Sequence, residues 1–153
     1  MPVQRASSGK SGRGTVSNWN DKIIEEFRNN NGAVGGPFAG AHLLLLTTTG
    51  AKSGASRTSP MMYFDDGDRR LVIASKGGAP DNPAWFHNLV ANPAVHVEAS
   101  VAEGIEEYDA IATPLPDDER QTVFAALAER APGFGSYQAK TARLIPVVAV
   151  TRT

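Results

Sequence analysis

The sequence predicts an α+β fold in which a small, mostly antiparallel β-barrel carries helices on its outside. About six short segments have the apolar runs or two-residue alternation of β-strands, and glycine- or aspartate-rich turns separate several of them. Three other segments repeat apolar residues at helical spacing. With 153 residues, the chain is long enough for one core. We therefore expect a single domain over residues 18–153, preceded by a tail over residues 1–17.

The composition is that of a globular protein without a nucleic-acid-binding surface. Apolar residues make up 41% and charged residues 20% of the chain, and the net charge is −1. Cysteine is absent, which excludes disulfides and zinc–thiolate sites. No apolar run approaches membrane-spanning length, and the N-terminus lacks the hydrophobic centre of a signal peptide. These features predict a cytoplasmic protein.

The N-terminal part is expected to hold a flexible tail and a helix. Residues 1–17 are rich in serine and glycine and include basic but no acidic residues, which predicts disorder. Weak attachment of this tail to anionic lipid at the inner membrane face is the functional alternative. Residues 18–29 place Ile23, Ile24 and Phe27 on one helical face, so this helix should pack on the barrel.

A β-hairpin follows the helix. Residues 43–48 form a leucine- and threonine-rich run that is typical of a buried strand. Gly50 and Gly54 mark a turn, and residues 57–64 resume a strand. After an aspartate-rich turn, a strand over residues 71–75 completes an expected meander of three strands.

The middle of the chain is expected to add a helix and a second antiparallel pair. Pro83 suits the first position of a helix over residues 84–90, with Asn82 as its N-cap. Apolar and polar residues alternate over 95–100 and again over 105–113. These two segments should therefore pair and extend the barrel.

The C-terminal part is expected to hold a helix, a loop and the last strand. Acidic residues after Pro116 suit a helix N-terminus, and Pro132 ends that helix. Residues 134–142 are interpreted as a loop. Residues 144–150 form the last strand, in which Pro146 indicates an edge or bulge position.

The loop of the predicted hairpin combines cations, hydroxyls and glycines in a way that suits an anion. Lys52 and Arg57 supply fixed positive charges, and Ser53 and Ser56 supply hydroxyls. The glycines should free backbone N–H groups for a phosphate or carboxylate. The loop lacks the glycine spacing and the following helix of a P-loop, and no dinucleotide-binding glycine triplet occurs. A solvated hairpin tip explains the two cations about equally well.

A second segment repeats this chemistry. Ser75, Lys76 and Gly77 join a hydroxyl, a cation and a glycine at the end of a strand. An apolar plane for an aromatic ring is available from Pro60, Met61, Met62 and Trp85. Two anion-binding loops and a ring platform predict a phosphorylated, flavin-like ligand.

The remaining polar residues do not define a catalyst made of protein groups alone. His42, His87 and His96 are scattered without the spacing of metal ligands, so no metal site is predicted. No serine–histidine–aspartate arrangement and no acidic pair in a cleft can be inferred. The chemistry of a bound cofactor therefore fits best.

Four motifs occur in a characteristic order: LLTTTGAKSG with the following SR and SP (residues 45–60), ASKGG (74–78), NPAWFHNLVANP (82–93) and RLIPVV (143–148). Together they resemble the deazaflavin-dependent nitroreductase family, whose members use reduced coenzyme F420. The resemblance extends from about residue 18 to the C-terminus. It implies a split β-barrel of the flavin-reductase type. It also implies hydride transfer from the coenzyme to a quinone, a nitroaromatic compound or an unsaturated lactone.

The resemblance further implies roles for individual residues. Lys52 and Arg57 match cations that bind the coenzyme's phosphate and acidic tail. With Ser53 from the hairpin loop, the expected coenzyme contacts are Lys52, Ser53, Arg57, Pro60, Met61, Ser75, Lys76, Gly77, Trp85 and Asn88. As catalytic residues, Ser75 should polarise the acceptor, and Tyr137 or solvent should supply the proton. Some relatives carry several tyrosines before the last strand where only Tyr137 remains here, which leaves the acceptor range open.

Two other functions fit the same residues. A related barrel enzyme that uses FMN would need the same anion-binding loops and ring platform, and a yellow purified protein would identify it. A non-catalytic carrier of the deazaflavin fits the lack of an obvious acid or base. The expected partner is a small-molecule electron acceptor, and the oligomeric state stays open.

Overall fold

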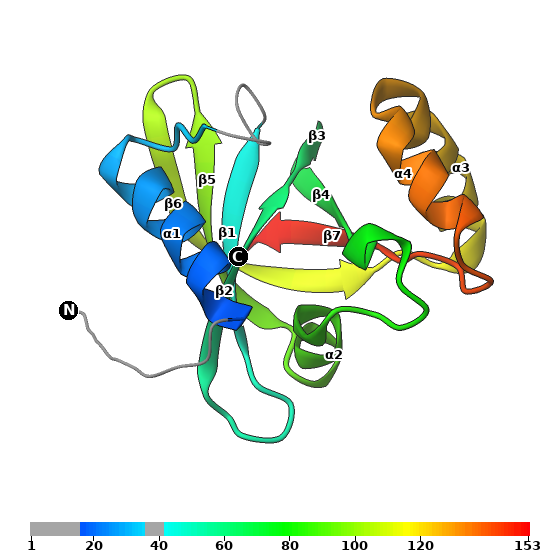
Figure 1. The fold of residues 1–153 in the computed structure, drawn as a ribbon, viewed down its shortest axis with the longest axis horizontal. Coiled ribbons are helices and arrows are strands. Elements are labelled where there is room, and N and C mark those ends of the chain that lie inside the picture. The colour runs from blue at the N-terminus through cyan, green and yellow to red at the C-terminus, as the bar shows by residue number, and fades with distance from the viewer. Residues whose placement is uncertain (1–15, 36–41) are drawn as a thin grey trace.

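The structure is a computed structural model that describes residues 16–35 and 42–153 (Figure 1). The strands in this part are β1 (Leu43–Thr49), β2 (Ser56–Met62), β3 (Phe64–Asp66), β4 (Arg69–Ile73), β5 (Ala94–Val101), β6 (Gly104–Pro114) and β7 (Val147–Arg152). The helices are α1 (Val16–Asn29), the 3-10 turn η2 (Lys76–Gly78), α2 (Ala84–Ala91), α3 (Asp117–Arg130) and α4 (Pro132–Ala139). All seven strands form one antiparallel sheet in the order β2-β1-β5-β6-β7-β4-β3. The predicted α+β class is confirmed.

The sheet curls into a split barrel because its two edge strands are consecutive in the chain. β2 and β3 lie at opposite ends of the strand order, yet only Tyr63 separates them. The Tyr63 amide donates to the carbonyl of His42, and its hydroxyl donates to the carbonyl of Ser100 on β5. The chain thus passes from one edge of the sheet to the other at Tyr63, which brings the two edges together.

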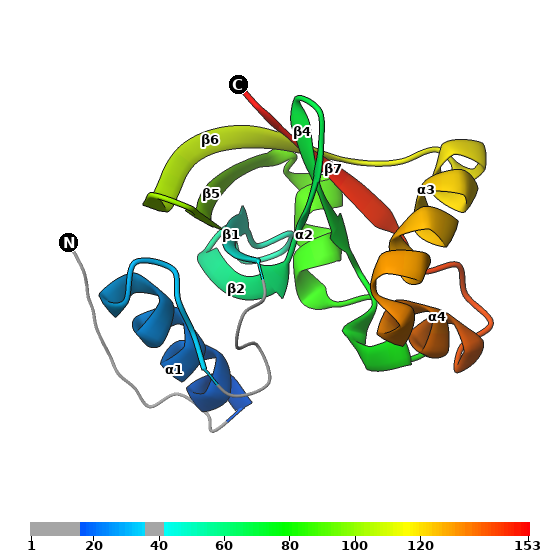
Figure 2. The same ribbon diagram turned by 90° about the horizontal axis from the view of Figure 1, so that it is seen from above.

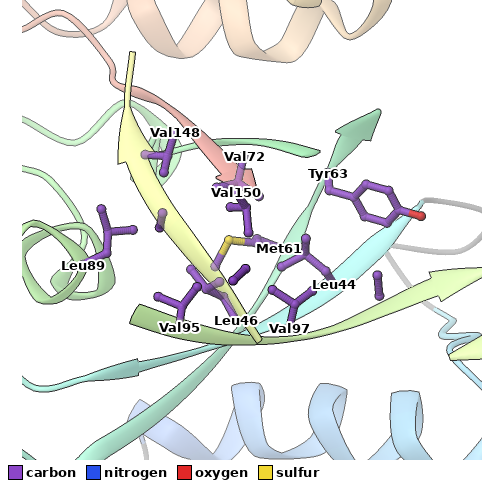
Figure 3. Packing of buried hydrophobic residues seen from close by; sticks show 13 residues of the cluster. Leu44, Leu46, Met61, Tyr63, Val72, Leu89, Val95, Val97, Val148 and Val150 are labelled. Atoms are coloured by element: carbon purple, nitrogen blue, oxygen red, sulfur yellow. The ribbon is translucent and has the colours of Figure 1, made fainter. Parts of the chain in front are cut away.

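The leucine run of β1 is buried on both faces of the sheet. Leu44 and Leu46 point into the barrel, where they pack with apolar residues of the neighbouring strands (Figure 3). Leu43 and Leu45 point to the other side, where Phe27 of α1 covers them. All four leucines are fully buried. A strand covered on both faces needs a continuous apolar run, which explains why this segment does not alternate.

Helices α3 and α4 lie at the other end of the sheet (Figure 2). A second core lies between them and the sheet. Phe124 and Leu127 of α3 pack there against Phe64 and Ile73 of the sheet. Helix α2 lies against the barrel and inserts Leu89 into its interior. The sheet therefore holds α1 at one end, the pair α3–α4 at the other, and α2 between them.

The expectation of a loop over residues 134–142 is wrong, because α4 occupies most of this segment. Pro132 takes the first helical turn, where its missing N–H costs nothing. Phe134 and Tyr137 pack against the core beneath α3. The glycines in this helix lower its intrinsic propensity. Its formation depends on packing that a sequence pattern does not reveal.

Three strand predictions also need correction. The segment 57–64 is not one strand, since Tyr63 divides it into β2 and β3. β4 does not continue a meander beside β2; it pairs with β3 and β7. The last strand begins at Val147, so Pro146 precedes it and takes neither an edge nor a bulge position within it, and β7 itself lies between β6 and β4. Within the described residues the sheet has seven strands and the fold four α-helices, against the six and three expected.

The other predicted elements are confirmed. They are the helices α1, α2 and α3, the β1–β2 hairpin and the antiparallel pair β5–β6. The tail predicted over residues 1–17 lies almost wholly outside the described residues. In the part of the chain that the structure describes, no helix combines the length and apolarity needed to cross a membrane.

His96 on β5 is bonded to two carboxylates of β6. Its Nδ1 lies 2.8 Å from Asp109 Oδ1, and its Nε2 lies 2.7 Å from Glu107 Oε2. Both ring nitrogens can donate only when the imidazole is protonated. Partial burial disfavours this charge, but the hydrogen bonds to Asp109 and Glu107 outweigh the burial and raise the pKa of His96 above its ordinary 6.5.

We expect the free energy of unfolding to fall as the pH rises through the pKa of folded His96. Because folding raises this pKa, the added stability is fully present below pH 6.5 and is lost at higher pH. Denaturant unfolding over a pH series measures the effect. His96→Gln should remove this part of the pH dependence, whereas replacement of the exposed His87 by Gln should preserve it. The same pH dependence in the wild type and the His96 variant would contradict the prediction.

Candidate functional site

A cleft of about 1470 Å³ opens between α1, the β1–β2 hairpin and the start of α2. Helix α1 contributes Asn20, Asp21, Ile24 and Arg28. The hairpin contributes residues 50–53 and 56–59, and α2 contributes Ala84, Trp85, His87 and Asn88. The volume exceeds the roughly 300–1,000 Å³ of most small-molecule pockets. The cleft therefore has room for a large coenzyme.

This cleft brings together half of the expected coenzyme contacts. Those on its wall are Lys52, Ser53, Arg57, Trp85 and Asn88. Those outside it are Pro60, Met61, Ser75, Lys76 and Gly77, and the expected catalytic Tyr137 also lies outside. The side chain of Met61 points into the barrel core (Figure 3). The expected site residues are thus divided: five line the cleft, Pro60 and Met61 lie farther along β2, and Ser75, Lys76 and Gly77 lie in the loop that packs against α4, the helix of Tyr137.

The hairpin loop holds its shape through hydrogen bonds of its own. The Gly50 amide donates to the Ala55 carbonyl, and the Gly54 amide donates to the Gly50 carbonyl. The Ala55 amide donates to Ser53 Oγ. Gly54 has a φ of +73°, which disfavours any other residue. The expectation that the loop amides are free for an anion is met only in part. Of the six backbone amides of residues 50–55, those of Lys52 and Ser53 have no acceptor among the described residues, and the other four do.

Asn88 on α2 ties the hairpin loop to the helix. Its side chain is buried, and Oδ1 accepts a hydrogen bond from the Ala51 amide at 3.0 Å. Its Nδ2 donates to Thr48 Oγ1 at 3.2 Å. One turn later, Asn92 Nδ2 donates to the Thr49 carbonyl at 3.4 Å. The amide of Asn88, expected to contact the coenzyme, is therefore used to hold the loop in place.

Lys52 and Arg57 are the cations that the hairpin presents to the cleft. Both side chains are exposed, and neither forms an ion pair with another described residue. Arg57 lies opposite Thr48 at the end of the hairpin, close in sequence to the loop that carries Lys52. Two cations without an ionic partner on one wall attract a phosphate or a carboxylate.

An ion pair anchors α1, which forms the opposite wall. Arg28 Nε and Nη2 donate to Glu98 Oε1 and Oε2 on β5 at 2.9 and 2.7 Å. The side chain of Glu98 is only 11% exposed, so Arg28 supplies the hydrogen bonds that the buried carboxylate oxygens need. Sequence reasoning missed the pair because its members are 70 positions apart. Arg28 therefore both lines the cleft and holds α1 against the barrel.

The loop over residues 75–78 packs against α4. Lys76 has a φ of +48°, which costs a non-glycine residue about 1–2 kcal/mol. At Gly78, a Cβ atom would lie 2.8 Å from the Tyr137 carbonyl oxygen. Gly78 therefore lets the helix that carries Tyr137 approach the loop that carries Ser75.

Two polar side chains of this loop and of the residues after it, Lys76 and Asn82, are bonded to other groups of the protein. Lys76 Nζ lies 3.3 Å from Asp81 Oδ2. Asn82, expected to cap α2, instead accepts a hydrogen bond from Arg143 Nη1 at 2.6 Å. Pro83 takes the N-cap position without a side-chain bond, so the predicted cap is wrong. An arginine distant in sequence competes successfully for the Asn82 oxygen.

The curled sheet and its cation-bearing cleft define a split-barrel protein with space for a large anionic cofactor. The family model described as F420H(2)-dependent quinone reductase matches residues 19–152. The chain therefore belongs to the F420H(2)-dependent quinone reductase family. This membership confirms the resemblance to deazaflavin-dependent reductases, and coenzyme F420 takes precedence over FMN as the cofactor.

Individual relatives agree with this membership. An F420H(2)-dependent quinone reductase of Mycobacterium tuberculosis is 42% identical over 133 residues, which cover 82% of this chain and 85% of the relative. A solved F420-H2 dependent reductase, FDR-A, is 40% identical with a TM-score of 0.60 and covers 71% of this chain and 92% of its own. A second solved structure, described as a domain-swapped dimer, is 33% identical with a TM-score of 0.62. It covers 89% of this chain and 99% of its own.

Replacing Arg28 with methionine should lower the free energy of unfolding by about 1–3 kcal/mol, because Glu98 would stay buried without its donor. Denaturant unfolding measures the loss. Adding Glu98→Met should recover much of it, since the buried charge is then removed as well. Arg69→Met is the matched control: its partners Asp66 and Glu119 are more exposed, so we expect a loss below about 1 kcal/mol. Equal losses for the two single variants would count against the buried-pair argument.

Proposed function

We propose that this chain reduces quinones with reduced coenzyme F420, and that the anionic part of the coenzyme binds Lys52 and Arg57. The observation that carries the proposal is the position of these two exposed cations on one wall of a large cleft. Neither has an ionic partner within the described residues. Family membership supplies the coenzyme, and the acceptor is inferred from the names of the relatives.

The residues of the cleft fit the chemistry of this coenzyme, which combines a flat ring with a phosphate and an acidic tail. Lys52 and Arg57 suit the anionic groups. Trp85 is half-buried and packs against the barrel core, so it offers a fixed aromatic surface on the same cleft. The hydrogen bonds of Asn88 hold the hairpin loop in place before any ligand arrives, which reduces the entropy lost on binding.

Of the expected site residues outside the cleft, Ser75 is suited to contact the electron acceptor. Among the described residues, the Ser75 hydroxyl has no hydrogen-bond partner, while the Ser75 carbonyl accepts from Arg143. The backbone is thus held and the hydroxyl is free to donate to an acceptor oxygen. Pro60, Met61, Lys76 and Gly77 remain proposed coenzyme contacts, Met61 through its backbone because its side chain lies in the core.

When bound, the reduced deazaflavin supplies a hydride from its ring carbon. The protein's part is to hold donor and acceptor in contact and to exclude water. Ser75 stabilises the negative charge that develops on the acceptor oxygen, and Tyr137 or solvent delivers the proton to that oxygen. No acid or base with a strongly shifted pKa is needed for this chemistry.

Arg57→Ala should weaken the affinity for reduced coenzyme F420 by at least about tenfold, because a charge-assisted contact to phosphate contributes roughly 1.5–3 kcal/mol. Lys52→Ala should act in the same direction. A fluorescence titration of the coenzyme measures both. Lys22→Ala is the control: it removes an exposed cation of α1 that does not line the cleft. Unchanged affinity in the Arg57 variant, or an equal loss in the Lys22 variant, would refute the assignment.

Ser75→Ala should lower kcat at least about tenfold with a quinone acceptor, because a donor to the developing oxyanion is lost. The coenzyme Kd should stay nearly unchanged. Steady-state kinetics, followed by the absorbance of the reduced coenzyme, separate the two quantities. Ser136→Ala, which alters an exposed hydroxyl on α4, should leave both as they are. Weaker binding with unchanged kcat in the Ser75 variant would assign this residue to coenzyme binding instead.

A further inference from the structure

Arg143 connects the segment before β7 to the loop between β4 and α2. Its Nε donates to the Ala79 carbonyl, and its Nη2 donates to the Ser75 carbonyl, each at 2.9 Å. Its Nη1 donates to the Ala74 carbonyl at 3.3 Å and to Asn82 Oδ1 at 2.6 Å. One guanidinium therefore holds four acceptors that are spread along the whole loop.

The arrangement requires an arginine. A guanidinium carries five N–H donors in a rigid planar fork, whereas a lysine ammonium places three donors on one nitrogen. All four acceptors are neutral oxygens, so these bonds fix the shape of the loop and do not serve to neutralise an acid. The loop also contains Lys76 in a left-handed conformation. Such strain persists only where the surroundings hold the backbone in place.

Arg143 is itself held by α3 and α4. Gln138 Nε2 donates to the Arg143 carbonyl at 2.7 Å. Gln138 Oε1 accepts from Arg120 Nη2 at 2.7 Å and from the Ile145 amide at 3.0 Å. Arg120 is buried, and its Nε donates to the Ile145 carbonyl at 2.9 Å. Because Gln138 follows Tyr137 on α4, this network joins the helix that carries Tyr137 to the loop.

We propose that Arg143 is a positioning residue for the hydride-transfer reaction. It fixes the loop over residues 74–82, and with it the placement of Ser75 relative to Tyr137 on one side and to Trp85 of α2 on the other. The inference rests on the proposed function, because it takes Ser75 as the group that meets the acceptor. The two cations proposed to bind the anionic part of the coenzyme, Lys52 and Arg57, lie on the β1–β2 hairpin, away from the loop that Arg143 holds. Loss of Arg143 should therefore affect turnover more than coenzyme affinity, which it can change only through Lys76 and Gly77.

The kinetic test compares Arg143→Ala and Arg143→Lys with Arg130→Ala, which removes an arginine from the end of α3. We expect kcat to fall roughly 10- to 100-fold in Arg143→Ala, the effect of a small misplacement of reacting groups. The coenzyme Kd should change much less. Lysine should fail to restore turnover, because its single nitrogen cannot serve four acceptors. Added methylguanidinium should restore part of the lost kcat in Arg143→Ala and should not raise kcat in Arg143→Lys or Arg130→Ala.

Hydrogen exchange measured without coenzyme tests separately whether Arg143 holds the loop over residues 74–82. The Gly78 and Ala79 amides donate within the loop, so their exchange should become faster in both Arg143 variants and stay unchanged in Arg130→Ala. If the wild type binds no coenzyme, the proposed function fails, and this measurement still decides whether Arg143 holds the loop. Unchanged exchange of these amides, equal losses of kcat and affinity, or no rescue by methylguanidinium would overturn the inference.

Discussion

Burial of β1 on both faces is the constraint on which the cleft depends. Leu44 and Leu46 fill the barrel while Leu43 and Leu45 meet α1, so a shift of register would exchange the two sets and disturb both layers. Each leucine contributes about 1.5–3 kcal/mol by its burial. The same strand that receives α1 continues into the hairpin. The two walls of the cleft are thus attached to one buried element.

The two loops that carry the expected site residues take their shape from side chains of other elements. The hairpin loop depends on Asn88 of α2, and the loop over residues 74–82 depends on Arg143 from the segment before β7. Neither loop has a strand ladder to satisfy its backbone groups, so these side chains provide the partners. The result is a pair of loops fixed against the packed part of the molecule, as positioning a hydride donor and acceptor requires.

The cationic side chains of the described residues fall into two groups, those that form ion pairs between elements of the fold and those that do not. Arg28, Arg70 and Arg152 each meet a carboxylate and connect elements of the fold. Lys52 and Arg57 have no such partner in the described part of the chain, although both lie on the wall of the cleft between α1, the hairpin and α2. These three paired arginines connect elements of the barrel, whereas Lys52 and Arg57 remain available to an anionic ligand.

The sequence by itself determined the secondary structure of most of the chain, the hairpin with its two cations and the family motifs, because periodicity, turn residues and fixed charges are local properties. It did not reveal α4, the pairing of β4 with β7 or the partners of Asn82 and Asn88. Those were decided only by the tertiary structure. A hydrogen bond or a strand pair selects its partner in space, and a residue such as Arg143, more than 60 positions from its acceptors in the chain, has no local pattern that identifies them.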